Sequence, residues 1–230
     1  MSRIFITGDC HADISRFGDV WQNVVHPTEE DYVIILGDFG LVWADREDLY
    51  EQIHLDWLQA QPWTTIVIGG NHENYAALER NYPIEKVTIG KGEVRCRRVR
   101  PKILFMERGE IFYINNKSFF CFGGADSTDK EYRIINESWW ERERPSEEEF
   151  EYAKAKLDWN NGEVDYILSH EGPTCVQRWL YHSVVTNPTA DMLYEFYHTV
   201  KYGDWYFGHH HKNIDLPDNL HILYENIIEL

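Results

Sequence analysis

The sequence predicts a mixed α/β fold that contains more than one β-sheet. Short apolar runs rich in Ile, Val, Phe and Tyr recur along the 230 residues, and amphipathic helical patterns lie between several of them. The stretch from Ile103 to Phe122 instead holds three such runs in succession, which is typical of antiparallel strands. We therefore expect α/β units in the outer thirds of the chain, antiparallel pairing in the middle, and a single domain over residues 1–230.

The predicted strands are short and have the composition of buried segments. In chain order they are Ile4–Thr7, Tyr32–Leu36, Thr64–Ile68, Ile103–Met106, Ile111–Ile114, Phe119–Phe122, Tyr166–Leu168, Trp205–Phe207 and Leu220–Tyr224. The pair Asn115–Asn116, ahead of Lys117, is typical of a hairpin connection between two of them.

Three helical patterns each place apolar residues on one face of a predicted helix. The faces consist of Leu49, Ile53 and Trp57, of Phe150, Ala153 and Leu157, and of Met192, Leu193, Phe196 and Val200. The second pattern begins with Ser146-Glu147-Glu148-Glu149, which has the form of a capping box at a helix N-terminus.

The composition excludes several classes of protein. Hydrophobic residues make up 43% of the chain and charged residues 27%, as in ordinary globular proteins, and no apolar run approaches the length of a membrane span. The net charge of −17 disfavours a passive nucleic-acid binder but is compatible with an enzyme that binds phosphate through metal ions. The four cysteines form no C-x-x-C pair and the N-terminus does not resemble a signal peptide, so we predict a cytoplasmic protein with free thiols.

Residues with metal-ligand chemistry follow five of the predicted strands. The segments are Gly8-Asp9-Cys10-His11, Gly37-Asp38, Gly69-Gly70-Asn71-His72-Glu73, Ser169-His170 and Gly208-His209-His210-His211. Because the carboxyl ends of parallel strands lie along one edge of a sheet, these side chains can meet at one point. Glycine before the candidate ligands permits a sharp turn and close approach of the backbone.

The residue types and their number indicate a two-metal site. Carboxylate, imidazole and amide oxygen suit divalent metals such as Mn, Fe or Zn. In Asp9-Cys10-His11 and His209-His210-His211, strand alternation would send the first and third side chains to the same side. The candidate ligands are Asp9, His11, Asp38, Asn71, His170, His209 and His211. Because seven ligands are too many for one tetrahedral ion, we expect two metals that share one aspartate, about 3.5–4 Å apart.

The order D-x-H, G-D, G-N-H-E, a lone histidine after a strand and then G-H-x-H resembles the calcineurin-like metallophosphoesterase superfamily. The resemblance extends from Asp9 to His211 and implies two mixed β-sheets packed as a sandwich and flanked by helices, with a dinuclear metal centre. It implies one metal held by Asp9, His11 and His211, a second held by Asn71, His170 and His209, and Asp38 as the bridge. The stretch from Gly123 to Trp140 is similar to that of a small bacterial and phage-type subgroup.

The resemblance also implies a reaction, the hydrolysis of phosphate mono- or diesters by a hydroxide held between two divalent cations. We expect manganese as the metal, with iron, zinc and nickel as alternatives. His72 matches the family's catalytic histidine and would donate a proton to the leaving oxygen or stabilise the transition state. Glu73 or Asp45 would orient its ring.

Two departures from the family pattern bear on the substrate. Ala12 stands where the family commonly has glycine. Asp38 is followed by Phe39-Gly40, whereas protein Ser/Thr phosphatases have an Asp-Arg-Gly whose arginine grips the substrate phosphate. A small phosphodiester or nucleotide is therefore favoured over a phosphoprotein. The alternatives are a nuclease acting on single-stranded or short nucleic acid, and a non-catalytic metal-binding scaffold that acts through protein partners.

Several residues have both a structural and a functional interpretation. Asn71 could cap the following helix as well as bind metal. His210 lies between two candidate ligands and should point away from them. The basic run from Lys91 to Lys102 is either a solvated edge strand or a phosphate anchor. Arg133 is either a phosphate clamp at the mouth of the site or part of a structural ion pair.

Overall fold

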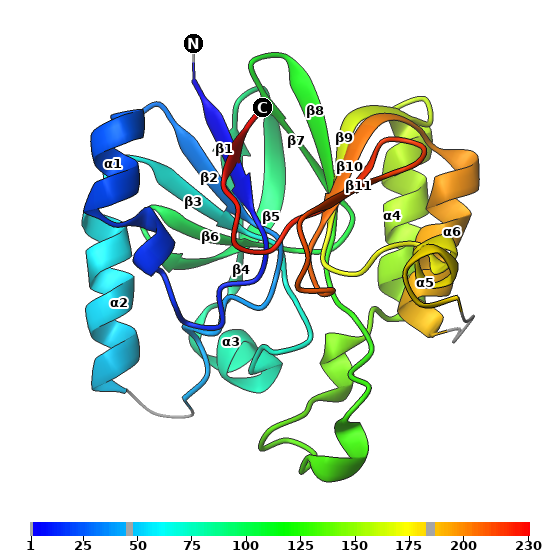
Figure 1. The fold of residues 1–230 in the computed structure, drawn as a ribbon, viewed down its shortest axis with the longest axis horizontal. Coiled ribbons are helices and arrows are strands. Elements are labelled where there is room, and N and C mark those ends of the chain that lie inside the picture. The colour runs from blue at the N-terminus through cyan, green and yellow to red at the C-terminus, as the bar shows by residue number, and fades with distance from the viewer. Residues whose placement is uncertain (1, 45–47, 183–186) are drawn as a thin grey trace.

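A computed structural model describes residues 2–44, 48–182 and 187–230 and shows two mixed β-sheets packed face to face (Figure 1). The first sheet has the strand order β13 (Ile228–Glu229), β1 (Ile4–Thr7), β2 (Tyr32–Ile35), β3 (Thr64–Val67), β6 (Ile103–Met106), β5 (Gly92–Arg100) and β4 (Ile84–Ile89). The second has the order β11 (Ile214–Leu216), β12 (Leu220–Ile222), β10 (Lys201–Phe207), β9 (Glu163–Ser169), β8 (Lys117–Phe122) and β7 (Glu110–Ile114).

Helices cover the outer faces of both sheets, so the predicted α/β sandwich is confirmed (Figure 1). The first sheet is covered by α1 (Asp19–Val25) and α2 (Leu49–Ala60), and the second by α4 (Glu147–Trp159), α5 (Thr174–Tyr181) and α6 (Pro188–Thr199). The short helix α3 (Tyr75–Asn81) follows the loop after β3.

Parallel pairing aligns the strand ends that carry the candidate ligands. In the first sheet, Thr7 lies beside Ile35 and Ile35 beside Val67, so that β1, β2 and β3 end level with one another. In the second sheet, β9 and β10 also run parallel, with Leu168 beside Tyr206. The loops that follow these five strands therefore leave the sandwich at one edge.

Apolar side chains fill three layers of the molecule. Between the sheets, Ile6 and Ile34 pack in one cluster with Phe112 and Phe119. The outer face of the first sheet packs against residues such as Leu55 and Trp63, and that of the second sheet against Phe150 and Phe196. Each fully buried large side chain stabilises the fold by about 1.5–3 kcal/mol, which gives the strand ends a rigid support.

The predicted strand runs all form strands, although the middle of the chain is divided between the sheets. Ile103–Met106 forms β6 of the first sheet, whereas β7 and β8 form a hairpin in the second. Asn115 and Asn116 connect this hairpin with φ values of 52° and 65°, as the two-residue turn requires. The sequence prediction missed β4 and gave β5 only as one interpretation of the basic run, because polar residues interrupt both strands and no continuous apolar run marks them.

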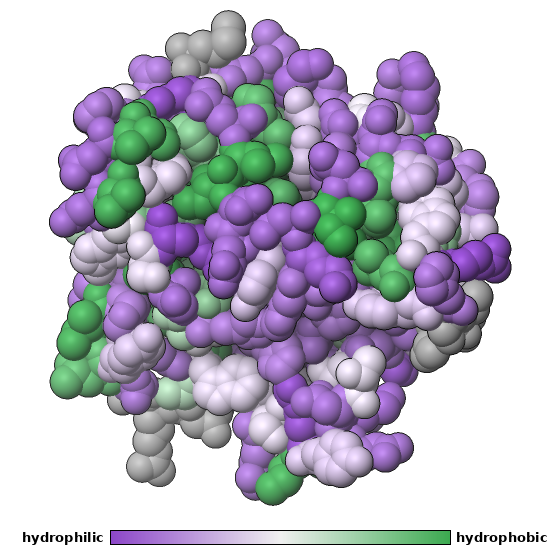
Figure 2. Space-filling model, in the orientation of Figure 1, coloured by the Kyte–Doolittle hydropathy of each residue, from purple (hydrophilic) through white to green (hydrophobic). Residues whose placement is uncertain are grey.

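Two of the three predicted helix faces are confirmed and one is wrong. The buried residues of α4 include Phe150, Ala153 and Leu157, and those of α6 include Leu193 and Phe196. In α2, however, Leu49 is 75% exposed and Ile53 is 56% exposed, while Leu55 and Leu58 are buried. Figure 2 shows hydrophobic side chains at the surface over α1 and α2.

The basic run from Lys91 to Lys102 is not an edge strand. It forms β5, which lies between β6 and β4, and its arginines form ion pairs within the protein. The pairs are Arg95–Glu110, Arg97–Glu107, Arg98–Glu85 and Arg100–Asp56. These pairings explain why an acidic protein has a basic strand and give no support to the phosphate-anchor interpretation.

In the described part of the chain, no helix combines the length and the apolar composition that crossing a membrane requires. Cys10, Cys96 and Cys121 are buried free thiols, and Cys175 is a half-buried one, as predicted from the absence of paired cysteines.

Candidate metal centre

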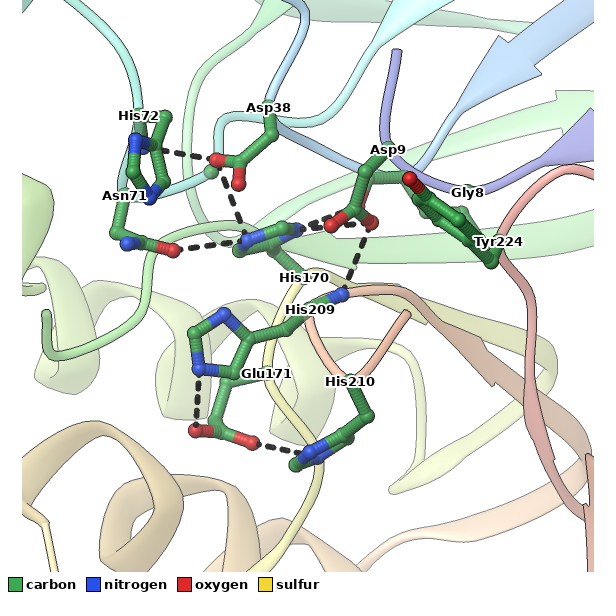
Figure 3. A network of polar contacts seen from close by, with 12 residues as sticks. Gly8, Asp9, Asp38, Asn71, His72, His170, Glu171, His209, His210 and Tyr224 are labelled. Carbon is green, nitrogen blue, oxygen red and sulfur yellow. Dashed lines mark hydrogen bonds and ion pairs between the residues drawn. The ribbon is translucent and has the colours of Figure 1, made fainter. Parts of the chain in front are cut away.

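The loops after β1, β2, β3, β9 and β10 bring the candidate ligands together at one edge of the sandwich (Figure 3). Among them, Asp9, His11 and His211 form one group that could hold a metal ion, and Asp9, Asp38 and His170 form another. The sequence prediction that these distant segments meet is confirmed.

The backbone of these loops is left-handed at four candidate ligands, which corrects one argument made from the sequence. His11, Asp38, His209 and His211 have φ values of 46°, 47°, 64° and 49°. The side chains of His11 and His211 are therefore directed by tight turns beyond the strand ends, not by the alternation of an extended strand. Ala12 shares this conformation, with φ at 64°. Such backbone is costly for residues other than glycine and is common at functional sites.

Glycines next to the candidate ligands permit close packing of side chain against backbone. A Cβ at Gly208 would overlap Oδ1 of Asp9, and one at Gly70 would overlap Oδ1 of Asp38. Gly37, with φ at 100°, leaves space for the ring of His170. The role predicted for these glycines is therefore confirmed.

The first donor group surrounds Oδ2 of Asp9, which is buried and accepts no well-formed hydrogen bond. Nε2 of His211 lies 3.0 Å from this oxygen and Nε2 of His11 lies 3.8 Å from it. The two Nε2 atoms are 3.1 Å apart. A buried carboxylate oxygen faced by two imidazole nitrogens is a donor set that a divalent cation fits.

The second donor group surrounds Nε2 of His170, which lies 3.0 Å from Oδ1 of Asn71 and 3.3 Å from Oδ1 of Asp38. Nδ1 of His170 lies 2.7 Å from the carbonyl oxygen of Leu36, and this contact fixes the orientation of the ring. Helix α3 is capped by Asn74, so the alternative role of Asn71 as its cap is wrong.

Asp38 faces both groups, since its Oδ1 lies by His170 while its Oδ2 is 3.7 Å from Nε2 of His11. Burial alone would raise the pKa of Asp38, but the charge of His170 holds that pKa well below its usual range. Burial alone would lower the pKa of His170, but Asp38 and then Asp9 outweigh it and raise this pKa to about 10. The buried carboxylates of Asp38 and Asp9 thus stabilise a positive charge beside them.

His209 is linked to a buried carboxylate that the sequence prediction missed. Nε2 of His209 lies 3.5 Å from Oε2 of Glu171, and Nε2 of His210 lies 3.1 Å from Oε1 (Figure 3). Burial would raise the pKa of Glu171, but the two histidines lower it to about 2. The expectation that His210 points away from the candidate ligands is confirmed. The position of Glu171, directly after His170, was the signal that could have identified it.

The backbone N–H of His72 donates to Oδ1 of Asp38 over 2.8 Å, which places the imidazole beside the donor groups. The prediction that Glu73 orients the His72 ring is wrong. The carboxylate of Glu73 accepts instead from the backbone N–H groups of Phe39, Gly40 and Gly70 and joins two of the ligand-bearing loops. Burial raises the pKa of Glu73 to about 8. Asp45, the other predicted partner, lies outside the described residues.

Arg133 approaches the His72 ring, with one terminal nitrogen 3.2 Å from Nδ1 and 3.1 Å from Nε2. The same guanidinium forms an ion pair of 2.8 Å with Asp129. The ion pair predicted for Arg133 is thus present, and the side chain also lies at the candidate centre.

Two solved structures have a similar fold. A candidate 5′-nucleotidase from Staphylococcus aureus, solved with α-ketoglutarate, has a TM-score of 0.50 and 16% identity, over 97% of this chain and 48% of that one. A phosphopantetheinyl hydrolase from Mycobacterium tuberculosis has a TM-score of 0.50 and 15% identity, over 97% of this chain and 88% of that one. This chain thus spans about half the length of the first structure, and identities this low show the fold alone.

A search of curated proteins finds no significant match. The family model described as calcineurin-like phosphoesterase matches residues 2–213, which include every candidate ligand and His72. The resemblance seen in the spaced motifs is therefore confirmed, and the chain belongs to the calcineurin-like phosphoesterase family.

Proposed function

We propose that this protein is a metal-dependent phosphoesterase that hydrolyses small phosphate mono- or diesters, with nucleotides among the favoured substrates. The observation that carries the proposal is the convergence of two donor groups on either side of Asp38. One cation would be held by Asp9, His11 and His211, and the other by Asn71, His170 and His209, with Asp38 shared.

Divalent cations bound there supply an acidified water as nucleophile and positive charge for the phosphate oxygens, and manganese is the metal we expect. The residues of the chain provide the rest. Left-handed turns and buried contacts hold the ligand side chains in place, so that little reorganisation is needed when the substrate binds.

His72 would donate a proton to the leaving oxygen or stabilise the charge that develops there in the transition state. Its ring is close to Asp38 and His11, with ring centroids of His11 and His72 5.4 Å apart. Burial lowers the pKa of His72 below its usual value, although the charge of Asp38 opposes this. A neutral imidazole can still donate a hydrogen bond from one ring N–H to an oxygen on which negative charge develops.

Small substrates are favoured by two observations. The two similar structures carry names that refer to small phosphoesters, a nucleotide and a phosphopantetheinyl group. The arginines of β5 are engaged in ion pairs, which removes the main sequence argument for a nuclease that binds a long backbone.

A paired measurement of metal content and turnover tests the proposal. Manganese-loaded protein is assayed with a bis-aryl phosphodiester and a mono-aryl phosphate, and the bound metal is counted by elemental analysis. We expect two metals per chain and turnover of at least one ester. His72→Ala should keep the metals and lose most of the turnover, whereas His198→Ala on α6 serves as the control.

Two metals without turnover of any ester would favour the alternative of a non-catalytic scaffold. Full activity in metal-loaded His72→Ala would exclude the proposed role of that histidine.

A further inference from the structure

Residues 123–144, which we call the arm, connect β8 to the start of α4 and project beyond the edge of the sandwich (Figure 1). The base of the arm is attached to the candidate centre. Nδ2 of Asn71 donates to Oγ of Ser127 over 3.0 Å, and the N–H and Oγ of Ser127 donate to the buried carboxylate of Glu143. The indole of Trp139 donates to the same carboxylate over 2.6 Å. The arm is therefore fixed relative to the metal ligands.

Arg133 follows the short helical turn Lys130–Tyr132 of the arm, and its neighbours in the sequence are exposed to solvent. Tyr132 is 89% exposed and Ile134 is 59% exposed, whereas the side chain of Arg133 is 14% exposed. The charged side chain of Arg133 is thus largely buried, while those of Tyr132 and Ile134 are exposed to solvent. Since burial of apolar rather than charged groups is the usual preference, this reversed arrangement suggests a role for the guanidinium.

The protein holds this guanidinium in place without using all its donors. One terminal nitrogen pairs with Asp129, and the other donates to the carbonyl oxygen of Ser138 over 3.2 Å. Backbone N–H groups that donate to Ile134 O close the turn that presents Ser138. The nitrogen that pairs with Asp129 also lies near His72, almost equally far from both ring nitrogens, so it lies over the ring face and makes no in-plane hydrogen bond. A guanidinium has five N–H donors, and these contacts leave several for an anion.

Arg16 provides a contrast within the same site. Its terminal nitrogens donate to three oxygen atoms, those of the Thr7 hydroxyl and of the Tyr224 and Asp9 carbonyls. Arg16 therefore stabilises the backbone of the loop that carries Asp9. Arg133 instead contacts the ring of His72, whose centroid lies 5.4 Å from that of the partly exposed His11.

We propose that Arg133 binds the phosphate group of the substrate, and that the arm thereby selects doubly charged phosphate groups. The inference rests on the proposed function, because it concerns the substrate of that site. A planar guanidinium can form two parallel hydrogen bonds with phosphate oxygens, and a monoester dianion gains more from them than a diester monoanion.

The test compares manganese-loaded Arg133→Met and Arg133→Lys with the wild type. Arg98→Met is the matched control, since Arg98 also pairs with one carboxylate, that of Glu85, on β5. Calorimetry gives the Kd for inorganic phosphate, steady-state assays give kcat and KM for a mono-aryl phosphate and a bis-aryl phosphodiester, and metal content is measured for each variant. Arg133→Lys keeps the positive charge. If it binds phosphate better than Arg133→Met does, the loss of affinity in Arg133→Met arises from the missing charge and not from misfolding.

We expect Arg133→Met to keep its metals and to bind phosphate about 10-fold to 100-fold more weakly. Its KM for the monoester should rise more than its KM for the diester. Arg133→Lys should lie between Arg133→Met and the wild type, and Arg98→Met should behave as wild type.

Phosphate affinity within twofold of wild type in Arg133→Met would overturn the proposal, as would a loss confined to kcat, which would make Arg133 a positioning residue for His72. Absence of phosphate binding by the metal-loaded wild type would also overturn it. If the wild type binds metal and phosphate but hydrolyses no ester, the proposed function fails, whereas the phosphate affinities still decide the role of Arg133.

Discussion

The candidate centre has a buried half and an exposed half, and the two are held by different means. On the buried side, His170 and Asp38 contact backbone groups of Leu36 and His72 as well as each other. On the exposed side, the side chains of His11 and His211 are 35% and 49% exposed, and they converge on one carboxylate oxygen. The buried half is therefore enclosed by protein, whereas the exposed half remains in contact with solvent.

The largest effect is expected at Asp38, which joins the two halves. Asp38→Asn should lower turnover about 100-fold or more and reduce the metal content, because the shared charge is lost. Elemental analysis and the phosphodiester assay measure both quantities, and Asp56→Asn, at an exposed aspartate, is the control. Two bound metals and normal turnover in Asp38→Asn would show that the halves do not depend on this carboxylate.

The second prediction concerns stability and separates the halves directly. In metal-free protein, His170→Ala should lower the free energy of unfolding by about 3–5 kcal/mol, because it leaves the buried charge of Asp38 without its partner. His211→Ala should lower it by only about 0.5–1 kcal/mol, because the half-exposed ring that faces Asp9 is screened by solvent. Urea unfolding measures both values. Equal losses would contradict the distinction between the halves.

The sequence identified the candidate centre better than it identified the contacts that support it. Asp9, Asp38 and His170 each follow a recognisable apolar strand, and strand ends in parallel sheets meet at one edge. Glu171, the partner of His209, was missed. Its position next to a candidate ligand is visible in the sequence, but the direction of its side chain is not. The orientation of Glu73 toward backbone amides was missed for the same reason.

Helix α2 shows a second limit of sequence reasoning. Its apolar residues at four-residue intervals predicted the wrong buried face, since Leu49 and Ile53 are exposed and the sheet is contacted by Leu55 and Leu58. Apolar residues lie on more than one side of this helix, so periodicity alone could not decide between them. The ion pairs of β5 were not predicted, because they join residues that lie far apart in the chain.

A smaller effect is expected at Glu171, which supports the centre without touching the first donor group. Glu171→Gln should weaken manganese binding about 10-fold, because His209 loses the charge that orients its ring. Competition with a chelator measures the affinity, and Glu195→Gln on α6 is the control. An unchanged affinity would mean that His209 is oriented without Glu171.

The smallest effect is a pH dependence of the metal-free protein. The pKa of His170 is raised to about 10, so its contribution to stability is complete below the unfolded value of about 6.5 and is lost as the pH rises toward 10. Burial raises the pKa of the Glu73 carboxyl to about 8, so its deprotonation lowers the stability as the pH rises from 4.5 to about 8 and adds little further change above that pH.

Between pH 8 and 10, the wild type should therefore lose up to about 1.4 kcal/mol of unfolding free energy per pH unit more than His170→Asn does. Urea unfolding at several pH values gives the difference between the two proteins. Parallel curves over this range would show that His170 is not charged in the folded, metal-free protein.

The left-handed turn after β1 has a consequence for engineering. Ala12 has φ at 64°, and its half-buried methyl group packs against the apolar cluster on the outer face of the first sheet. Replacement by glycine should relieve the steric cost of this conformation and, after the greater freedom of the unfolded chain is counted, stabilise the metal-free protein by about 0.5 kcal/mol. Thermal unfolding would detect the gain. The stabilised variant would provide a better background for destabilising substitutions of the candidate ligands.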